Sequence, residues 1–171
     1  MTTIDMSVVI KRADLDRLIE AVQPVVMLRV IGQRLISFVD ESFRTRGRGG
    51  WRPLAPVTIA MRLGGSDAPL QDTGKYKQSF VSETDGRTYV EVGTNLKVAS
   101  GIPLASIHEH GVTIRVKQAR VLAAQSRGGV WFHFGKEVTI PARPVLPTAS
   151  QAVAAIKPTL EAMLERTKGA T

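Results

Sequence analysis

Hydrophobic residues recur at steps of three and four between Pro24 and Thr45, and charged or polar residues occupy the positions between them. This spacing is typical of an amphipathic helix with one face turned toward a core. Pro24 suits the first turn, where its missing N–H breaks no helical hydrogen bond. The apolar positions of this predicted helix are Leu28, Ile31, Leu35, Phe38, Val39 and Phe43.

The two ends of the chain show weaker patterns of the same kinds. Ser7–Lys11 is predicted to be a short strand, and Asp14 can cap a helix that runs to about Val22. A closing helix is expected from about Thr148. Its apolar stripe keeps its phase across Pro158, which predicts one bent helix rather than two. That stripe comprises Val153, Ile156, Leu160, Met163 and Leu164.

Apolar residues alternate with polar ones from about residue 78 onward, which indicates strands. Ser79–Thr84 and Thr88–Gly93 are joined by Asp85-Gly86-Arg87, a hairpin signal in which the glycine suits a positive φ. Short helices are expected at Thr58–Leu63 and Lys75–Ser79. Further strands are predicted at Val112–Val116, Val121–Ala124, Val130–Phe134 and Val138–Ile140.

No internal repeat, low-complexity segment or linker divides the sequence. With 171 residues, the chain has a normal size for one domain and can bury a core without disulfides or metals. The sequence therefore predicts a single α+β domain over residues 1–171. In it, N-terminal helices and a C-terminal helix pack on a mainly antiparallel sheet with long loops.

A stiff arm is predicted where the last strand ends. Pro141, Pro144 and Pro147 each fix their own φ, lack an N–H and disfavour helix at the preceding residue. Arg143 lies between two of these prolines, so a rigid backbone presents its guanidinium. One interpretation is that the guanidinium is directed at a carboxylate or a row of carbonyls, in the same chain or in a neighbouring subunit. The other is a strand exit whose arginine is merely solvated.

Glycines alternate with arginines directly after the long predicted helix. Arg46, Arg48 and the arginines that flank them form a basic loop, and Trp51 is expected to anchor this loop to the body of the protein. The loop either contacts phosphates or an acidic surface, or is a flexible, solvated connection. It is not a Walker loop, because no Gly-Lys-Ser/Thr sequence follows and no strand precedes it. Arg127 occupies the tip of another predicted hairpin, at Gln125–Gly129.

The formal net charge of +8 suits an acidic partner, whether nucleic acid, an acidic protein surface or an anionic membrane. Aromatic residues make up only 5%, which does not favour a base-stacking platform. The absence of cysteine excludes disulfides, thiolate zinc sites and cysteine nucleophiles. The N-terminus has no signal-peptide pattern and no apolar run reaches membrane-spanning length. We therefore expect synthesis in the cytoplasm and no membrane partner.

His108-Glu109-His110 is the strongest candidate for chemistry. On a strand, His108 and His110 would share a face and could bind a metal, with His133 as a third ligand if the fold brought it close. The alternative is that they are turn and surface residues before Gly111. Metalloprotease spacing, a serine elbow, paired carboxylates and a dinucleotide fingerprint are all missing. The sequence therefore indicates neither an enzyme nor a bound cofactor.

A series of short landmarks runs along the chain: Phe43, Trp51-Arg52-Pro53-Leu54, Thr58, Leu70-Gln71-Asp72-Thr73-Gly74, Val90-Glu91-Val92-Gly93-Thr94, Ala105, Ile107-His108-Glu109-His110-Gly111 and Ile140-Pro141-Ala142-Arg143-Pro144. In this order they resemble the virion morphogenesis family of tailed bacteriophages, also known as tail completion proteins. The resemblance covers most of the chain. Each landmark alone is weak, and their order is what is specific. Val145 departs from the pattern, because the family usually has an aromatic residue there.

The resemblance implies a structural protein of the phage neck or upper tail, which completes or terminates the tail and allows it to join a DNA-filled head. It further implies a homo-oligomeric ring, expected to be a hexamer, through which double-stranded DNA passes without sequence-specific binding. The implied partners are the tail tube protein and the head–tail connector or stopper protein. The expected location is the virion, after assembly in the host cytoplasm.

The predicted interface residues are Arg143 with Pro141 and Pro144 for subunit docking, Trp51 as loop anchor, and Arg46, Arg48 and Arg127 as contacts at loop tips. Two hypotheses from other classes stay open. One is a small basic nucleic-acid-binding protein that uses the loop Arg44–Arg52. The other is a metal-dependent hydrolase built on His108, Glu109 and His110.

Overall fold

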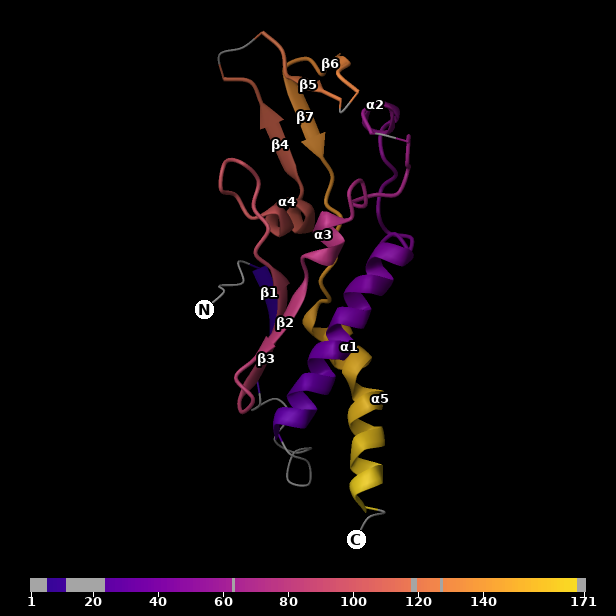
Figure 1. The fold of residues 1–171 in the computed structure, drawn as a ribbon, viewed down its shortest axis with the longest axis vertical. Coiled ribbons are helices and arrows are strands. Elements are labelled where there is room, and N and C mark those ends of the chain that lie inside the picture. The colour runs from indigo at the N-terminus through magenta and orange to yellow at the C-terminus, as the bar shows by residue number, and fades with distance from the viewer. Residues whose placement is uncertain (1–5, 12–23, 63, 118–119, 127, 169–171) are drawn as a thin grey trace. The chain divides into compact units, whose positions relative to one another are not determined.

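The computed structural model describes residues 6–11, 24–62, 64–117, 120–126 and 128–168 (Figure 1). Helices and short antiparallel strands make up this part of the chain, which confirms the predicted α+β class. The chain divides into two compact units. Unit 1 comprises the described parts of Met1–Glu41, Ser79–Asn95 and Leu146–Thr171, and unit 2 comprises those of Ser42–Gln78 and Leu96–Val145. The single domain expected from the sequence stays a prediction.

Helix α1 (Pro24–Arg44) forms where the hydrophobic pattern predicts it, and its residues up to Glu41 belong to unit 1. Arg29, Gln33 and Arg34 lie exposed on its polar side. The side chains that α1 buries in unit 1 are Met27, Leu28, Ile31, Leu35 and Val39. Burial of this stripe, rather than helix propensity, supplies most of the stability of such a helix. The helix predicted from Asp14 to Val22 lies outside the described residues.

Unit 1 contains an antiparallel sheet with the strand order β1 (Met6–Lys11), β3 (Tyr89–Thr94), β2 (Val81–Thr84). Val90 and Val92 of the central strand β3 are fully buried. Gly32 of α1 faces this sheet at Ser82 and Val90. A Cβ at Gly32 would be 3.0 Å from Val90 Cγ2 and would collide with the Ser82 side chain. The missing side chain therefore allows the helix to approach the sheet closely.

The turn between β2 and β3 forms at Asp85-Gly86-Arg87, as predicted. Asp85 Oδ1 accepts hydrogen bonds from the backbone N–H groups of Arg87 and Thr88, with N···O distances of 2.9 and 2.8 Å. Gly86 has a φ of 74°, which glycine adopts without strain. Hydrogen bonds, chiefly that from the Thr88 hydroxyl, hold the pKa of the Asp85 carboxyl well below its ordinary value.

Helix α5 (Ala149–Lys168) is one helix that continues through Pro158, as the phase of its stripe predicts. Its start is capped reciprocally. Thr148 N donates to Gln151 Oε1 at 3.0 Å, and Gln151 N donates to Thr148 Oγ1 at 3.3 Å. This pair is a capping box, in which two backbone donors at the helix start are satisfied by side chains.

One position of the predicted α5 stripe is wrong. The buried residues of α5 among those described are Ala152, Ile156 and Leu160, whereas Val153 is 57% exposed. Ala152 lies four residues before Ile156 and so belongs to the same face, and Val153 is rotated about 100° away from it. Beside this face, Arg34 Nε of α1 donates to the Ala155 carbonyl at 3.4 Å. Helices α1 and α5 therefore lie side by side in unit 1 (Figure 1).

Unit 2 contains three short helices: α2 (Pro56–Ala60), α3 (Lys75–Gln78) and α4 (Leu104–His110). Helix α2 begins two residues before the predicted Thr58, because Pro56 occupies its first turn. Thr73 Oγ1 accepts a hydrogen bond from the backbone N–H of Lys75, the first residue of α3, at 3.3 Å. Helix α4 ends at His110 and is followed by Gly111, whose φ of 72° and ψ of 169° are open to glycine almost alone.

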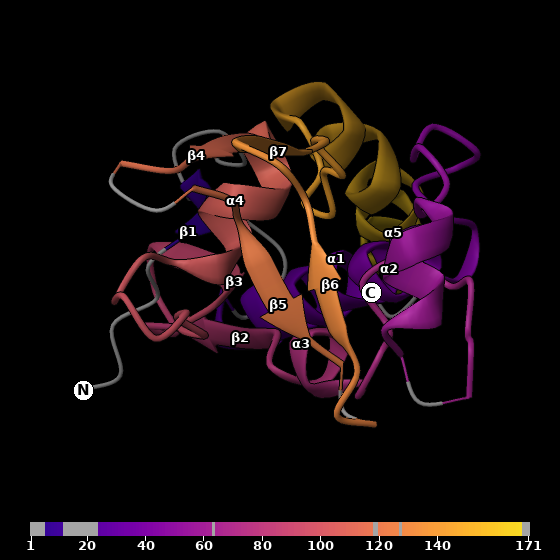
Figure 2. The ribbon, with the colours of Figure 1, turned by 90° about the horizontal axis from the view of Figure 1, so that it is seen from above.

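The remaining strands of unit 2 form two separate pairs, β4 (Val112–Arg115) with β7 (Glu137–Ile140) and β5 (Ala123–Gln125) with β6 (Trp131–His133) (Figures 1 and 2). The expectation that these strands complete one sheet is wrong. Backbone hydrogen bonds such as Phe134 N to Leu122 O, at 2.8 Å, connect the pairs into one interrupted hairpin, which comprises the described residues among 112–140. Among the described strands, each strand of this hairpin pairs with the strand that folds back on it and with no other.

None of the described helices is long and apolar enough to cross a membrane.

Candidate functional site

The proline arm, Pro141–Pro147, is fastened to helix α4 through its own backbone. Arg143 N donates to the His108 carbonyl at 2.6 Å, and Val145 N donates to Glu109 Oε1 at 2.7 Å. Gly111 makes this contact possible, because a Cβ there would lie 2.8 Å from Ala142 N and 2.9 Å from Ile140 O. The His-Glu-His-Gly segment is therefore a clasp that holds the arm.

Two carbonyl groups of the same arm accept hydrogen bonds from side chains outside helix α4. Trp51 Nε1 donates to the Pro144 carbonyl at 2.9 Å, and Ser42 Oγ donates to the Val145 carbonyl at 3.1 Å. Trp51 is buried and meets the ring of Phe43 edge to face, with centroids 5.9 Å apart. Trp51 thus anchors the end of the basic loop within unit 2, and its place in a subunit interface stays a prediction.

The side chain of Arg143 turns into unit 2. Arg143 is only 5% exposed, and its Nε and Nη2 atoms donate to the carbonyls of Arg52 and Pro53 at 3.1 and 3.3 Å. The predicted row of carbonyls is therefore the target, and it belongs to the same chain. The interpretation of a solvated arginine is wrong, because the arm and the segment after Trp51 close over the guanidinium.

Arg143 carries its charge without a balancing carboxylate among the residues that the structure describes. Within the described part of the chain, no ion pair with Asp or Glu involves Arg143. Burial lowers its pKa, and the nearby positive charge of Arg62 lowers it further. The two carbonyl acceptors therefore take the place of a carboxylate in compensating the cost of burying this cation.

The histidine pair lies on helix α4, not on a strand. Residues two apart on a helix are about 200° apart around its axis. His108 is half-buried and His110 is exposed, so the shared face that the metal hypothesis required is not formed. Among the residues that the structure describes, no group of three or more His, Cys, Asp or Glu side chains is placed to hold a metal ion.

His108 lies against Tyr76 in a buried environment, with ring centroids 5.1 Å apart. Burial, and secondly the charge of Arg143, lowers the pKa of His108 to about 4, so that the imidazole is neutral at pH 7. Its Nδ1 atom is buried and has no hydrogen-bond partner among the described residues. Burial, and secondly the charge of Glu109, raises the pKa of the Tyr76 hydroxyl. A neutral His108 therefore avoids a second buried positive charge next to Arg143.

We expect acid to destabilise the protein through His108. Its pKa is about 4 when folded and near 6.5 when unfolded, so between these values the unfolded chain binds the extra proton. The contribution of His108 to the free energy of unfolding is fully present above pH 6.5 and is lost as the pH falls toward 4. Allowing for partial solvent screening, the loss between pH 7 and pH 5 is roughly 1–2 kcal/mol.

Urea unfolding at both pH values measures this loss. We expect His108→Gln to show a smaller drop in unfolding free energy between pH 7 and pH 5 than the natural sequence. His110→Gln, an exposed position on the same helix, serves as the control and should keep the full drop. Equal drops in the two variants would contradict the assignment to His108.

The basic loop is folded rather than an open, mobile connection. Gly47 N donates to the Ser42 carbonyl at 2.7 Å, and Trp51 N donates to the Arg46 carbonyl at 3.1 Å. Arg46 and Arg48 take the left-handed conformation, with φ of 53° and 57°. Arg46 Nη2 pairs with the carboxylate of Asp67 at 3.0 Å. The charge of Arg46 is therefore already engaged within unit 2.

The structure places three of the four remaining predicted interface residues. Arg48 is exposed, and its Nη2 donates to Ser42 Oγ at 3.3 Å. Arg127 lies outside the described residues. Pro144 is exposed and Pro141 half-buried, so the arm presents Pro144 at the surface while Arg143 holds it from inside. Their contacts with neighbouring subunits stay predictions.

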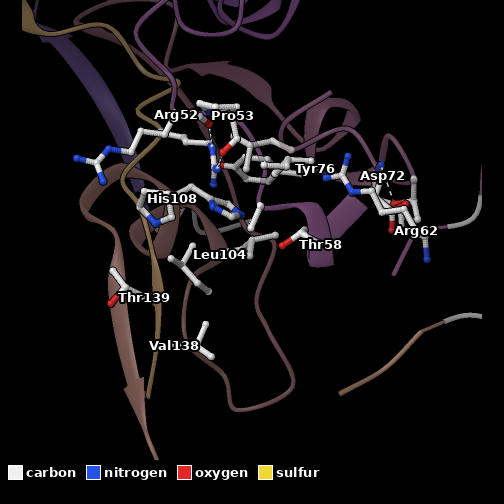
Figure 3. Close-up of a pocket in the computed structure, with 18 of the residues that line it drawn as sticks. Arg52, Pro53, Thr58, Arg62, Asp72, Tyr76, Leu104, His108, Val138 and Thr139 are labelled. Atoms are coloured by element: carbon white, nitrogen blue, oxygen red, sulfur yellow. Dashed lines mark hydrogen bonds between the residues drawn. The ribbon is translucent and has the colours of Figure 1, made fainter. Parts of the chain in front are cut away.

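A cavity of about 770 Å³ opens beside Arg143 in unit 2 (Figure 3). Its walls come from four segments: 52–62, 70–76, 96–108 and 134–143. The sequence pattern neither reveals this cavity nor assigns Tyr76 and Arg62 to a site. Leu54 and Leu70 are apolar residues of two of these segments, but only the fold brings the segments together.

Five of the landmark residues that carry the family resemblance gather around the arm. Phe43, Trp51, His108, Gly111 and Arg143 all belong to unit 2, and each contacts the arm or a residue that holds it. Comparisons with curated proteins and with solved structures returned no match. A comparison with family models matched residues 11–165 to the phage virion morphogenesis family. This match covers most of the sequence, and the chain therefore belongs to the phage virion morphogenesis family.

Proposed function

We propose that this protein completes or terminates the phage tail and allows it to join the head, as a homo-oligomeric ring around the DNA channel. The family indicates a structural role in the virion. The ring, its hexameric number and its place in the neck are our proposal. We further propose the tail tube protein and the head–tail connector or stopper protein as its axial partners.

The observation that carries this proposal is the exposed apolar surface of the hairpin over residues 112–140. Trp131 is 60% exposed and Val130 is 58% exposed. Ile114 and Val121 of the same hairpin are also exposed. A two-stranded hairpin is marginally stable alone in water, and exposed tryptophan is typical of binding surfaces. Both features favour a hairpin that is covered by another protein or another subunit.

The arm supports the same proposal from a second position. Arg143 and the clasp at Glu109 hold the backbone on both sides of Pro144, which is exposed. A rigid, pre-ordered segment loses little entropy when a partner binds it. We propose that Pro144 and the hairpin tip at Val130 and Trp131 are surfaces through which subunits dock.

DNA passes through the proposed ring as cargo and is not a specific ligand of it. The net charge of +8 favours contact with a polyanion. The alternative of a dedicated nucleic-acid-binding loop is less favoured, because Arg46 already pairs with Asp67. A salt titration of DNA binding separates the two. A dedicated site would make the monomer bind free DNA, with a steep loss of affinity as salt rises, whereas the ring proposal requires no DNA binding by the monomer.

Replacing Trp131 and Val130 by serine should abolish the oligomer without unfolding the chain. Exposed side chains contribute little to the stability of a free subunit, whereas an interface tryptophan commonly contributes about 2 kcal/mol or more per contact. Light scattering after size exclusion measures the mass, and thermal melts test the folding of each variant.

Val153→Ser is the matched control, because Val153 is a similarly exposed valine on α5. We expect it to leave the oligomer intact. An intact ring in the double variant would remove the hairpin tip from the interface. We expect the natural sequence to form the ring in the absence of its axial partners. A monomer at all concentrations would contradict that expectation.

A further inference from the structure

The cavity beside Arg143 has an apolar interior. Leu54, Leu70, Leu96, Leu104, Phe134 and Ile140 are among the side chains that line it. Its volume of about 770 Å³ lies in the range of pockets that hold a small ligand or a few side chains of a peptide. A site of this composition suits an aliphatic group, not a bare phosphate or a hydrated metal ion.

Positive charge is concentrated in the same walls. Arg52, Arg62, Lys75 and Arg143 line the cavity, whereas Asp72 is the one carboxylate among its lining residues. Arg143 is buried without an ion pair among the described residues, and its pKa is lowered by burial and by Arg62. A carboxylate that entered the cavity would lower the energy of both arginines, because it would balance charges that now repel each other.

A strand edge runs along one wall. Val138, Thr139 and Ile140 are consecutive residues of β7, and all three line the cavity. Strand β7 pairs with β4 on one side, and no other described strand pairs with it. Extended peptides commonly bind to such an edge through their backbone, while their side chains enter adjacent pockets.

We propose that this cavity binds an extended peptide segment of another virion protein, in which a leucine-like side chain is next to an aspartate or glutamate. The aliphatic side chain fills the apolar interior beside Leu104, and the carboxylate lies between Arg62 and the wall formed by Arg143. The peptide backbone follows β7. Only the origin of the segment, a protein of the virion, rests on the proposed function.

The probe is a terminally blocked peptide with the sequence Ser-Leu-Asp-Leu-Ser, compared with the same peptide carrying asparagine in place of aspartate. Binding to the full chain is followed by amide chemical shifts in NMR spectra. We expect shifts at Leu104, His108 and Ile140, and an affinity at least tenfold higher for the aspartate peptide. Equal affinities, or shifts scattered away from the cavity, would overturn the proposal.

Two charge variants test the role of the arginines. In Arg62→Gln, the preference for aspartate over asparagine should fall below threefold. Lys117→Gln removes the same charge from an exposed position that does not line the cavity, and should keep the tenfold preference. Because the readout is a ratio between two peptides, a modest loss of stability does not affect it. An unchanged preference in Arg62→Gln would overturn the electrostatic assignment.

The peptide-binding result also distinguishes the proposal of a peptide site from the proposal of a ring. Failure of the peptide to bind leaves the expected effect of the Val130 and Trp131 serine variant on the oligomer unchanged, so the two proposals can fail independently. If the aspartate peptide binds and also dissociates the oligomer, the segment belongs to a second copy of this chain. That result would overturn the assignment to a different virion protein.

Discussion

Replacing Arg143 by alanine is expected to lower the free energy of unfolding by roughly 3–5 kcal/mol. Two hydrogen bonds from a charged donor are lost, each worth about 1.5–3 kcal/mol. The carbonyls of Arg52 and Pro53 are left without their Arg143 donors, and a cavity forms in place of a side chain that is 5% exposed. For a chain of this size, the loss lowers the melting temperature by roughly 10 °C. Urea unfolding monitored by circular dichroism measures it.

Two further variants test whether the buried guanidinium is the cause of this loss. Arg143→Lys should recover only part of the stability, because lysine lacks the planar fork that reaches two carbonyls at once. Arg115→Ala is the control. Arg115 pairs with Glu137 at 2.6 Å but its side chain is 74% exposed, so its loss should cost no more than about 1 kcal/mol. An Arg143→Ala protein as stable as this control would contradict the internal brace and return Arg143 to the list of docking residues.

Gly111→Ala is expected to cost about 3 kcal/mol or more, and to reduce the yield of folded protein. The φ of 72° and ψ of 169° at Gly111 are strongly unfavourable for any residue with a Cβ. The new Cβ would also meet backbone atoms, Ala142 N at 2.8 Å and Ile140 O at 2.9 Å, which cannot rotate away. The substitution therefore separates helix α4 from the arm.

The control for this substitution is Gly101→Ala. Gly101 has a φ of 83°, but no heavy atom lies within 4 Å of the position that a Cβ would take. It should show only the cost of the left-handed conformation, about 1–2 kcal/mol. Chemical unfolding of both variants separates backbone strain from the clash. Equal losses would mean that close approach of α4 to the arm contributes nothing to stability.

The sequence predicts those elements whose signals are long or local. Helix α1 has a stripe that repeats along most of its 21 residues, so its bounds follow from periodicity within a residue or two. The β2–β3 turn is determined by Asp85 and Gly86, which act on backbone groups within four residues. The proline arm is likewise rigid for reasons contained in its own residues.

Helix α4 could not be predicted in this way. Its seven residues make fewer than two turns, too few to show a helical period, and they carry no strong helix signal. Pro103 before it and Gly111 after it were the available indications of a helix start and end. Because the sequence does not reveal this helix, it leaves open a strand on which His108 and His110 would share one face as metal ligands.

The candidate site depends on contacts between distant parts of the chain. The carbonyls that accept from Arg143 lie 91 and 90 residues before it in the sequence. The sequence shows that the guanidinium is presented rigidly, but it does not show where the acceptors lie. The same holds for the cavity, whose four wall segments are separated by stretches of sequence without a common pattern.

The most direct measurement of the central claim is electron microscopy of particles assembled by a phage that lacks this chain. We predict DNA-filled heads and separate tails that do not join, with normal particles restored when the natural sequence is supplied in the host. The Val130 and Trp131 serine variant should fail to restore them, and Val153→Ser should succeed. Joined, infectious particles in the absence of the chain would contradict its role in completing the tail.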